Sequence, residues 1–340
     1  MKKIITAVTV LFAFMVPVSS YAANDEVYTF KYAYAGAADE NTSLEHVVGL
    51  YLEEQLENRS DGKIDVELYP GGTMGDSEAS LEQVELGTLQ GCPTSDSKLS
   101  TRFPAIQVLA MPYLFDSTET ANKVLDGDFF REMYQAIEDE TGFTVAGVGV
   151  NGFRYLTNSK HEIKTPEDMK GLKFRVMDSE VMVEMMKNLG AVGVPMAYSE
   201  LYTAMQTNAI DGQENPATVV WRDYFDEVQG YMTCDGHTYS ADFIIVNHDW
   251  LSSLPEDLQN LVKEVCVEAG NVERETYDKW VDNAINEMVE RSGLQVYYPT
   301  EEELALFREA TQEPAREWLY ENVDAKWVDG ILEAVNAVKQ

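Results

Sequence analysis

The residue of this chain best suited to binding chemistry is Arg175. It lies within the run Lys173–Val176, where charged and apolar residues alternate as they do in a short strand with one packed face. A guanidinium group offers two parallel N–H donors of fixed geometry, which match a carboxylate. Cations are scarce here, with 25 Lys and Arg residues against 59 Asp and Glu residues. Arg175 is therefore the best candidate to bind a ligand carboxylate, and a surface or structural ion pair is the alternative.

A second candidate, Asn215, lies in the polar run Asp211–Pro216. The glycine and proline in this run indicate a turn between a strand and the next helix. The amide of Asn215 can both donate and accept hydrogen bonds, which suits a carboxylate or a hydroxyl group. The alternative is a turn residue without a ligand role.

Ser95 and Asp96 are candidates on a different segment. They belong to the polar loop 94–97, which follows an expected strand that ends near Cys92. In open α/β sheets, ligands bind beyond the carboxyl ends of the strands. The loop is therefore either a wall of the ligand site or a helix cap before residues 98–103.

The sequence contains no recognisable set of catalytic or metal-binding residues. No nucleophile, base and orienting residue form a set, and no phosphate-binding loop is present. A hydrolase would have to combine Glu214 or Asp211 with His237. We expect a protein that is not an enzyme and has no cofactor and no metal. The histidines without metal-ligand spacing are His46, His161, His237 and His248.

The cysteines give little information about the fold. Cys92, Cys234 and Cys266 are odd in number and widely separated, so they define no disulfide framework. One disulfide with one free thiol, and three buried thiols, are both open interpretations.

Strands and helices alternate in the first part of the chain. Residues 28–34 and 63–69 have the pattern of strands, and residues 44–56 and 76–86 have that of amphipathic helices. Thr42 or Ser43 can cap the first of these helices. This βαβ order predicts a parallel sheet with helices on its faces.

The rest of the chain continues the alternation and ends in long helices. A helix over residues 255–291, mildly interrupted at Gly270, exceeds the diameter of one lobe. Residues 300–338 form another helical segment, with a local break expected at Pro314. The other expected strands are 143–150, 154–155, 173–176, 192–195 and 240–246, and the other expected helices are 179–189 and 199–209.

The N-terminus has the features of a signal peptide. Lys2 and Lys3 precede the mostly apolar run Ile4–Val18, and the small residues Ser20 and Ala22 follow. The run is short for a membrane span, so an uncleaved anchor is the weaker alternative. We expect residues 1–22 to be removed and the mature protein to be exported.

The charge of the chain restricts its partners. The formal net charge is −34, and it becomes −36 once Lys2 and Lys3 are removed. Such a charge argues against binding to nucleic acid or to anionic lipid. An anionic ligand would meet an unfavourable overall field, so its site must concentrate cations locally.

Four motifs resemble those of one protein family. They occur in the family's order and with similar spacing, and flanking segments extend the similarity over nearly the whole mature chain. The chain resembles the periplasmic solute-binding proteins of tripartite ATP-independent periplasmic (TRAP) transporters, the DctP family, and especially the sialic-acid-binding members. The motifs are Gly152–Arg154, Gly171–Val176, Pro195–Glu200 and Asp211–Pro216.

This resemblance implies an α/β fold with two lobes, of the class II periplasmic solute-binding type. A ligand cleft then lies between the lobes, crossing hinge strands join them, and the long helix spans both. We expect a signal peptide at 1–22, a first lobe at 23–150 and a second lobe at 151–246, with residues 247–340 shared across the lobes.

The resemblance also implies roles for individual residues. Arg175 matches the strand arginine that forms the salt bridge to the ligand carboxylate, and Arg154 matches a second arginine that orients and adds to this contact. Asn215 lies in the family's last motif. Tyr198 lies where relatives have an aromatic wall, and its hydroxyl could add a hydrogen bond. His237 matches a cleft histidine of the sialic-acid binders, with core packing as the alternative.

Two carboxylates bear on the choice of ligand. Asp178 stands where the sialic-acid binders have an asparagine, and Asp96 lies in the candidate first-lobe loop. Carboxylates beside an anion site would repel a second ligand carboxylate but accept hydrogen bonds from hydroxyl or ammonium groups. The alternative is that Asp178 only pairs with Arg175 in the empty protein.

The function implied is that of the extracytoplasmic solute-binding subunit of a TRAP transporter. Such a protein captures a small organic acid in the periplasm and delivers it to the membrane subunits, and it is usually a monomer. We expect a sugar acid or another hydroxylated or amino monocarboxylate. Alternatives are a C4-dicarboxylate ligand, a sensory binding protein without transport, and a binding protein of an ATP-driven transporter.

Overall fold

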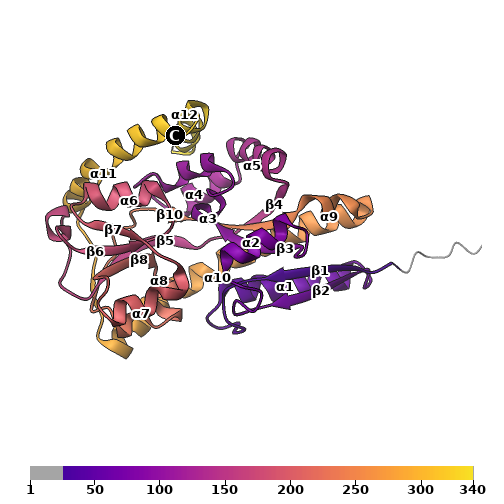
Figure 1. Ribbon diagram of the computed structural model, residues 1–340, viewed down its shortest axis with the longest axis horizontal. Helices are drawn as coiled ribbons and strands as arrows, with labels where there is room; N and C mark the ends of the chain where they lie inside the picture. The colour runs from indigo at the N-terminus through magenta and orange to yellow at the C-terminus, as the bar shows by residue number, and fades with distance from the viewer. Residues whose placement is uncertain (1–25, 340) are drawn as a thin grey trace, which may run out of the picture.

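A computed structural model describes residues 26–339 of the chain. Within these residues two β-sheets form two lobes, linked by segments that pass between them (Figure 1). The expected signal peptide, residues 1–22, lies outside the described residues. None of the described helices has the length and hydropathy that a membrane span requires.

The first lobe is built on a five-stranded sheet with the order β2-β1-β3-β11-β4. β1, β2 and β3 run parallel, and β11 runs antiparallel to its neighbours β3 and β4. The parallel arrangement expected from the alternation of strands and helices is thus confirmed for the first three strands. The strands are β1 (Tyr28–Ala33), β2 (Ile64–Tyr69), β3 (Gly91–Ser95), β4 (Phe143–Val148) and β11 (Asp242–Asn247).

Helices cover this sheet, and α1, α2, α3, α4 and α9 begin at side-chain caps. Ser43 caps α1, because its side chain accepts a hydrogen bond from the backbone N–H of His46. The apolar positions of α1 recur at helical spacing and are buried. The helices of this lobe are α1 (Leu44–Arg59), α2 (Ser77–Glu85), α3 (Asp96–Leu99), η1 (Pro104–Ala110), α4 (Thr118–Leu125), α5 (Asp128–Thr141) and α9 (His248–Ser253).

The second lobe is built on a seven-stranded sheet with the order β12-β9-β5-β8-β6-β7, in which β10 also pairs with β5. The strands are β5 (Gly152–Asn158), β6 (Lys173–Val176), β7 (Val192–Pro195), β8 (Gly212–Pro216), β9 (Tyr231–Thr233), β10 (Tyr239–Ser240) and β12 (Gln295–Tyr297). The helices are η2 (Pro166–Met169), α6 (Glu180–Asn188), η3 (Tyr198–Glu200), α7 (Leu201–Gln206), α8 (Ala217–Arg222) and η4 (Phe225–Glu227). β6, α6 and β7 lie where the sequence pattern predicts them.

The prediction of a turn at residues 211–216 is wrong, because this run forms the buried central strand β8. β8 lies between β5 and β6. Its glycine serves close strand packing, since a Cβ on Gly212 would lie 2.4 Å from the carbonyl oxygen of Thr157. The polar side chains are buried because partners on neighbouring strands satisfy them, and a local sequence pattern does not reveal those partners.

Two crossing segments connect the sheets and run beside each other. The N–H of Gly149 donates to the carbonyl of Asp242 at 2.8 Å, and the N–H of Asn151 donates to the carbonyl of Ser240 at 3.0 Å. The crossing strands implied by the resemblance are therefore present. Because β11 belongs to the first sheet, we propose that the chain returns to the first lobe at Ala241 rather than at residue 246.

The helix α10 (Glu256–Ser292) spans both lobes. It has 37 residues, a length of about 55 Å. It packs on α1 and β4 in the first lobe and on α8 in the second. The expected interruption at Gly270 is absent from α10. The glycine allows close backbone packing, because a Cβ there would lie 2.5 Å from the carbonyl oxygen of Val148 in β4.

The C-terminal helices are α11 (Glu301–Asn322) and α12 (Ala325–Val338). The expected break at Pro314 does not occur, and α11 continues through the proline. Buried contacts hold the helix on both sides of it, so packing outweighs the lost backbone hydrogen bond. α11 packs on α6 of the second lobe and α12 on α4 and α5 of the first.

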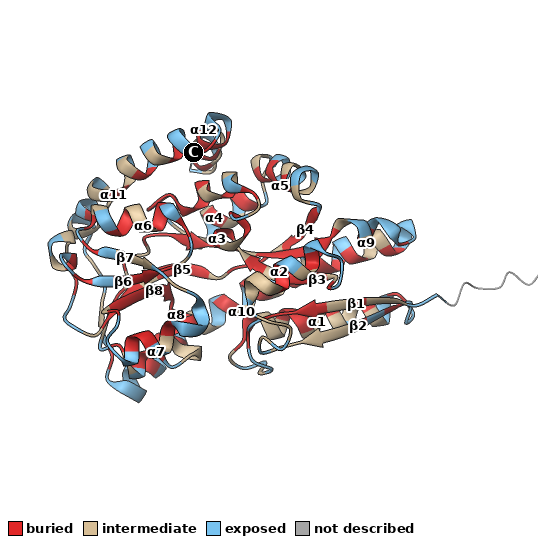
Figure 2. Cartoon of the chain, in the orientation of Figure 1, coloured by how far each residue is buried: buried red, intermediate tan, exposed pale blue. Residues whose placement is uncertain are grey.

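Buried residues follow both sheets and the helix faces that cover them (Figure 2). Two of the three cysteines, Cys92 and Cys266, are free thiols within this core, and Cys234 is a half-buried free thiol. No disulfide joins these three cysteines in the described part of the chain, so all three are free thiols as in the second interpretation. Two of them are fully buried and one is half-buried.

Candidate functional site

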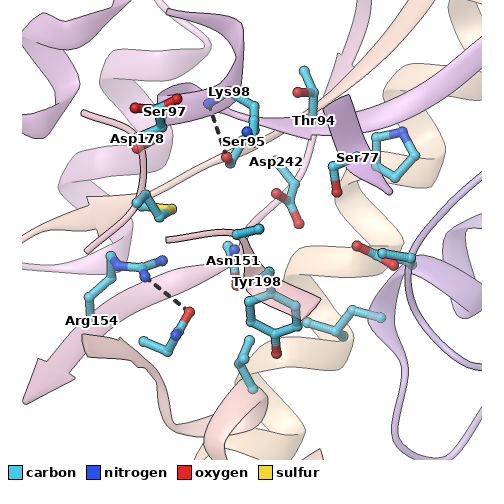
Figure 3. A pocket seen from close by; sticks show the side chains of 18 of the residues that line it. Ser77, Thr94, Ser95, Ser97, Lys98, Asn151, Arg154, Asp178, Tyr198 and Asp242 are labelled. Carbon is cyan, nitrogen blue, oxygen red and sulfur yellow. Dashed lines mark hydrogen bonds between the residues drawn. The ribbon is translucent and has the colours of Figure 1, made fainter. Parts of the chain in front are cut away.

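A cavity of ≈ 410 Å³ lies between the two lobes, where strands of both sheets end (Figure 3). Its first-lobe wall comes from the segments after β1, β2 and β3, and its second-lobe wall from those after β6, β7 and β8. The crossing segments contribute Asn151 and Asp242. Ligands of open α/β sheets bind beyond the carboxyl ends of strands, so this cavity is the candidate binding site.

Arg175 lines the cavity from β6, and only 4% of its surface is exposed. Its Nε donates to the carbonyl oxygen of Met196 at 3.0 Å, and its buried Nη1 has no partner among residues 26–339. Burial lowers the pKa of Arg175 to about 10, while the charge of Glu214 opposes this change. The guanidinium is still charged at neutral pH, and a buried charge without an ion pair favours an incoming anion.

Arg154 differs from Arg175 because its charge is balanced inside the protein. Its Nε donates to the carboxylate of Glu214, and its Nη2 donates to Oε1 of that carboxylate at 3.0 Å and to the Glu214 carbonyl oxygen at 2.7 Å. Both side chains are almost completely buried. The Nη1 of Arg154 is buried without a partner among the described residues, so one donor is still available in the cavity wall.

His237 and Asp235 extend this ion pair. The Nε2 atom of His237 lies 3.3 Å from Oε2 of Glu214, and its Nδ1 lies 3.1 Å from the Asp235 carboxylate. Burial acts to lower the pKa of His237, but the two carboxylates raise it to about 9. Burial acts to raise the pKa of Glu214, but Arg154 and His237 lower it to about 2. At neutral pH His237 is therefore protonated and Glu214 is ionised.

Tyr198 and Asn215 hold the two arginines in place. The guanidinium carbon of Arg175 lies 5.9 Å from the centre of the Tyr198 ring. Asn215 accepts a hydrogen bond from Nη2 of Arg154 at 3.0 Å and donates one to Gln213. Both residues line the cavity, so Tyr198 forms a wall beside one arginine and Asn215 fixes the orientation of the other.

The structure brings six of the eight predicted site residues to the cavity wall. These are Ser95, Arg154, Arg175, Asp178, Tyr198 and Asn215. Ser95 also caps α3, because the N–H of Lys98 donates to its Oγ at 3.4 Å, so the helix cap is present, and a ligand role of the 94–97 loop stays a prediction. Asp178 forms no ion pair with Arg175 within the described residues.

Asp96 and His237 lie outside the cavity lining. Asp96 accepts a hydrogen bond from the hydroxyl of Ser240 at 2.8 Å, on the crossing segment. His237 is buried against Glu214 and Asp235. The buried position of His237 supports its interpretation as a core residue. Asp96 contacts the hinge through Ser240.

The sequence analysis did not identify four charged residues that line the cavity, namely Glu45, Lys98, Arg222 and Asp242. Glu45 lies in the first turn of α1, Arg222 ends α8, and Asp242 begins β11. Their sequence separation hides their proximity, and each sits at an element end where a charged residue is ordinary. Three hydroxyl groups of the lining are also buried without a partner among the described residues, those of Thr94, Ser97 and Thr218.

This collection of groups can bind a small polar anion. Arginine side chains line the cavity together with carboxylates, hydroxyl groups and apolar side chains. Within residues 26–339, no group of three or more His, Cys, Asp and Glu side chains is arranged to hold a metal ion.

Comparison with known proteins identifies the family. Residues 34–322 match the model described as bacterial extracellular solute-binding protein, family 7, named DctP. The 2,3-diketo-L-gulonate-binding periplasmic protein of Escherichia coli (strain K12) is 31% identical over 77% of this chain and 79% of its own length. The sialic acid-binding periplasmic protein of Vibrio cholerae serotype O1 is 28% identical over 79% of this chain and 83% of its own.

A solved structure shows the same architecture. The TRAP periplasmic solute binding protein of Polaromonas sp. JS666, bound to D-erythronate, is 27% identical and superimposes with a TM-score of 0.84 over 92% of this chain and 99% of its own. The match covers both lobes and the cavity between them. The chain therefore belongs to the bacterial extracellular solute-binding protein family 7, as a periplasmic solute-binding subunit of a TRAP transporter.

Proposed function

We propose that this protein captures a hydroxylated monocarboxylate, such as a sugar acid, between its lobes, with Arg175 as the carboxylate anchor. The observation that carries this proposal is the buried guanidinium of Arg175, which has an unpartnered Nη1 and no ion pair among the described residues. A ligand carboxylate would supply both the missing charge and the missing hydrogen bond.

The number of ligand carboxylates follows from the charges in the second-lobe wall. Glu214 neutralises Arg154, and Asp235 is the counterion of His237. Arg175 is then the one cation of this buried group that lacks a carboxylate among the described residues. One ligand carboxylate balances it, and the free Nη1 of Arg154 can add a hydrogen bond.

The other end of the ligand is expected to carry hydroxyl groups. Asp178, Glu45 and Asp242 line the cavity, and their ionised forms would repel a second ligand carboxylate. The same oxygens accept hydrogen bonds from hydroxyl groups. The relatives named for diketogulonate and sialic acid, and the structure bound to D-erythronate, include ligands of this class. A relative of similar identity is named as a C4-dicarboxylate-binding protein, so the preference over a C4 dicarboxylate rests on the charges of the cavity alone.

The mechanism is capture rather than chemistry. A ligand that contacts both walls stabilises the closed arrangement of the lobes over an open one, because only the closed arrangement offers both sets of contacts. The closed complex then delivers the solute to the membrane subunits of the transporter. The relatives are named as binding proteins, and we infer that this chain catalyses no reaction. A sensory role without transport would predict no genes for TRAP membrane subunits nearby.

A thermal-shift screen of the refolded mature protein tests the proposal. Refolding removes any ligand carried through purification, and a ligand at a thousandfold excess over Kd stabilises the native state by about 4 kcal/mol. The panel contains sugar acids, uronates, amino acids and C4 dicarboxylates. We expect shifts from sugar acids that disappear in Arg175→Ala and persist in the control Arg131→Ala, whose side chain is 70% exposed. Shifts only from neutral or cationic solutes would refute carboxylate capture.

A further inference from the structure

The part of the cavity beside Tyr198 contains several polar groups. These groups are not needed to bind the ligand carboxylate at Arg175. Arg222 reaches this part of the cavity from α8 in the second lobe, and Glu45 and Asp242 reach it from α1 and β11 in the first lobe. Tyr198 lies between the two arginines, because its ring is beside Arg175 and its hydroxyl accepts from Nη2 of Arg222 at 3.3 Å. The two arginines therefore contact different parts of the Tyr198 side chain.

Arg222 is held in a fixed orientation with one donor group unused. Its Nε and Nη2 donate to the Asp223 carboxylate at 3.1 and 2.8 Å. Its Nη1 makes no hydrogen bond with the described residues. Asp223 also neutralises its charge, so Arg222 offers an N–H donor without offering a free positive charge. A second ligand carboxylate would thus find no uncompensated cation here.

Glu45 faces Arg222 from the opposite lobe. One of its carboxylate oxygens accepts from the backbone N–H of Gly36, and the other has no hydrogen bond with the described residues. Burial raises the pKa of Glu45, and the charge of Arg222 opposes this change. The two groups therefore interact electrostatically, but they form no ion pair within the described residues. A hydroxyl group of the ligand could donate to the carboxylate and accept from the guanidinium, because both residues line the same cavity.

Asp242 completes this end of the cavity. Figure 3 shows its carboxyl group projecting into the cavity near Asn151 and Tyr198. The carboxyl makes no hydrogen bond with the described residues. Burial raises the pKa of Asp242 to about 7, with the charges of Glu45 and Asp96 adding to this effect and those of Arg222 and Arg154 opposing it. The group can therefore donate as well as accept near neutral pH.

A buried hydroxyl group provides independent support. Thr94 is 3% exposed, lines the cavity, and its Oγ1 has no partner among the described residues. It lies on β3, next to Ser95, which pairs with Asp242 across the sheet. A buried hydroxyl without a protein partner is costly, so it favours a ligand atom that completes its hydrogen bond.

We propose that Glu45, Asp242 and Arg222 form a second subsite that binds hydroxyl groups at the end of the ligand remote from its carboxylate. This inference rests on the proposed carboxylate capture at Arg175. The subsite combines two lobe-one acceptors with a lobe-two donor, so a polyhydroxylated end bridges the lobes. The neutralised arginine and two acidic groups select against a second carboxylate.

Isothermal titration calorimetry with three acids of equal chain length tests this subsite. The probes are D-galactonate with other six-carbon aldonates, hexanoate, which lacks hydroxyls, and adipate, which has a second carboxylate. We expect the wild type to bind at least one aldonate at least a hundredfold more tightly than hexanoate or adipate. Each lost hydrogen bond to a charged group corresponds to about tenfold in Kd.

Variants then assign the preference to the subsite. We expect Glu45→Gln and Asp242→Asn each to reduce the aldonate-to-hexanoate preference about tenfold without weakening hexanoate binding. Glu54→Gln, an exposed position on the same helix, should leave the preference unchanged. The melting temperature without ligand identifies any variant that fails to fold, and the other variant then carries the test.

Each outcome separates the two proposals. If Arg175→Ala abolishes binding of all probes while both subsite variants keep the wild-type preference, the second subsite is refuted and carboxylate capture stands. If adipate binds most tightly and Arg222→Met removes that advantage, this end recognises a second carboxylate and the subsite is refuted. If no acid binds, or if Arg175→Ala binds them all as wild type does, the proposed function itself fails.

Discussion

The substitution Glu214→Gln tests the buried ion pair that supports the binding site. Glu214 is completely buried, and its carboxylate contacts both Arg154 and His237. Gln keeps the size of the side chain and one acceptor for Arg154, but it removes the negative charge. Two buried cations would then share the carboxylate of Asp235 alone.

The magnitude follows from the cost of an uncompensated buried charge. Removing one partner of a buried ion pair destabilises a protein by about 3–5 kcal/mol. Because Gln retains a hydrogen bond to Arg154, we expect the lower end, about 3 kcal/mol. The control is Glu301→Gln, which breaks the pair with Arg308 at a side chain that is 77% exposed. Exposed pairs contribute less than about 1 kcal/mol.

Urea denaturation at pH 7, followed by tryptophan fluorescence, measures this difference. The free energy of unfolding is compared among wild type, Glu214→Gln and Glu301→Gln without ligand, at equal m-values. A loss of less than about 1 kcal/mol in Glu214→Gln would mean that the charge of Arg154 does not depend on Glu214. The assignment of Arg175 as the unbalanced cation would then be refuted, because both arginines would tolerate burial alone.

Three further predictions concern the hinge, the pH dependence and the cavity wall. Gly270→Ala should destabilise the protein by about 1–3 kcal/mol in urea denaturation, because overpacking against β4 outweighs the gain in helix propensity. The control Gly230→Ala, where a Cβ meets open space, should be neutral. Equal effects of the two substitutions would refute the close packing at Gly270. The stability contributed by His237 should be complete below pH 6.5 and lost as pH rises through about 9. The stability contributed by Glu214 should be complete above pH 4.5 and lost as pH falls through about 2. Urea midpoints that do not change in either pH range would contradict this prediction. Tyr198→Ala should weaken carboxylate binding about 3- to 30-fold in calorimetry, because the ring supplies the cation–π contact with Arg175. Tyr198→Phe keeps the ring and should weaken binding much less. Equal losses in the two variants would assign the effect to the hydroxyl.

Elements with strong local patterns could be predicted from the sequence. The alternation in Lys173–Val176 and the cap at Ser43 depend on neighbours in sequence, and both occur as expected. β8 could not be predicted, because its run of polar residues resembles a turn until the partners on β5 and β6 are known. Pro314 misled the analysis for a similar reason, since packing of the helix outweighs the local preference.

The site was partly predictable for the same physical reason. The cavity lies where parallel strands end, and the topology rule predicts Ser95 and Asp96 at this edge. Ser95 lines the cavity, whereas Asp96 lies outside its lining. The pairing of Arg154 with Glu214 joins residues 60 positions apart, and no local pattern encodes it. Glu45 and Arg222 are further apart still and meet only because the lobes face each other. Sequence patterns therefore gave the residues of one wall but not the balance of charge across the cavity.

The central claim, that Arg175 captures a carboxylate, is tested most directly by calorimetry with a matched pair of solutes. D-erythronate and erythritol have the same four-carbon chain and differ in a carboxylate that replaces one alcohol carbon. We expect the refolded wild type to bind D-erythronate or a longer aldonate and none of the corresponding alditols. We expect Arg175→Ala to lose at least about a hundredfold in affinity, because it removes a charge-assisted bidentate contact. Retained affinity in Arg175→Ala, or binding of an alditol as tight as that of its acid, would contradict the account.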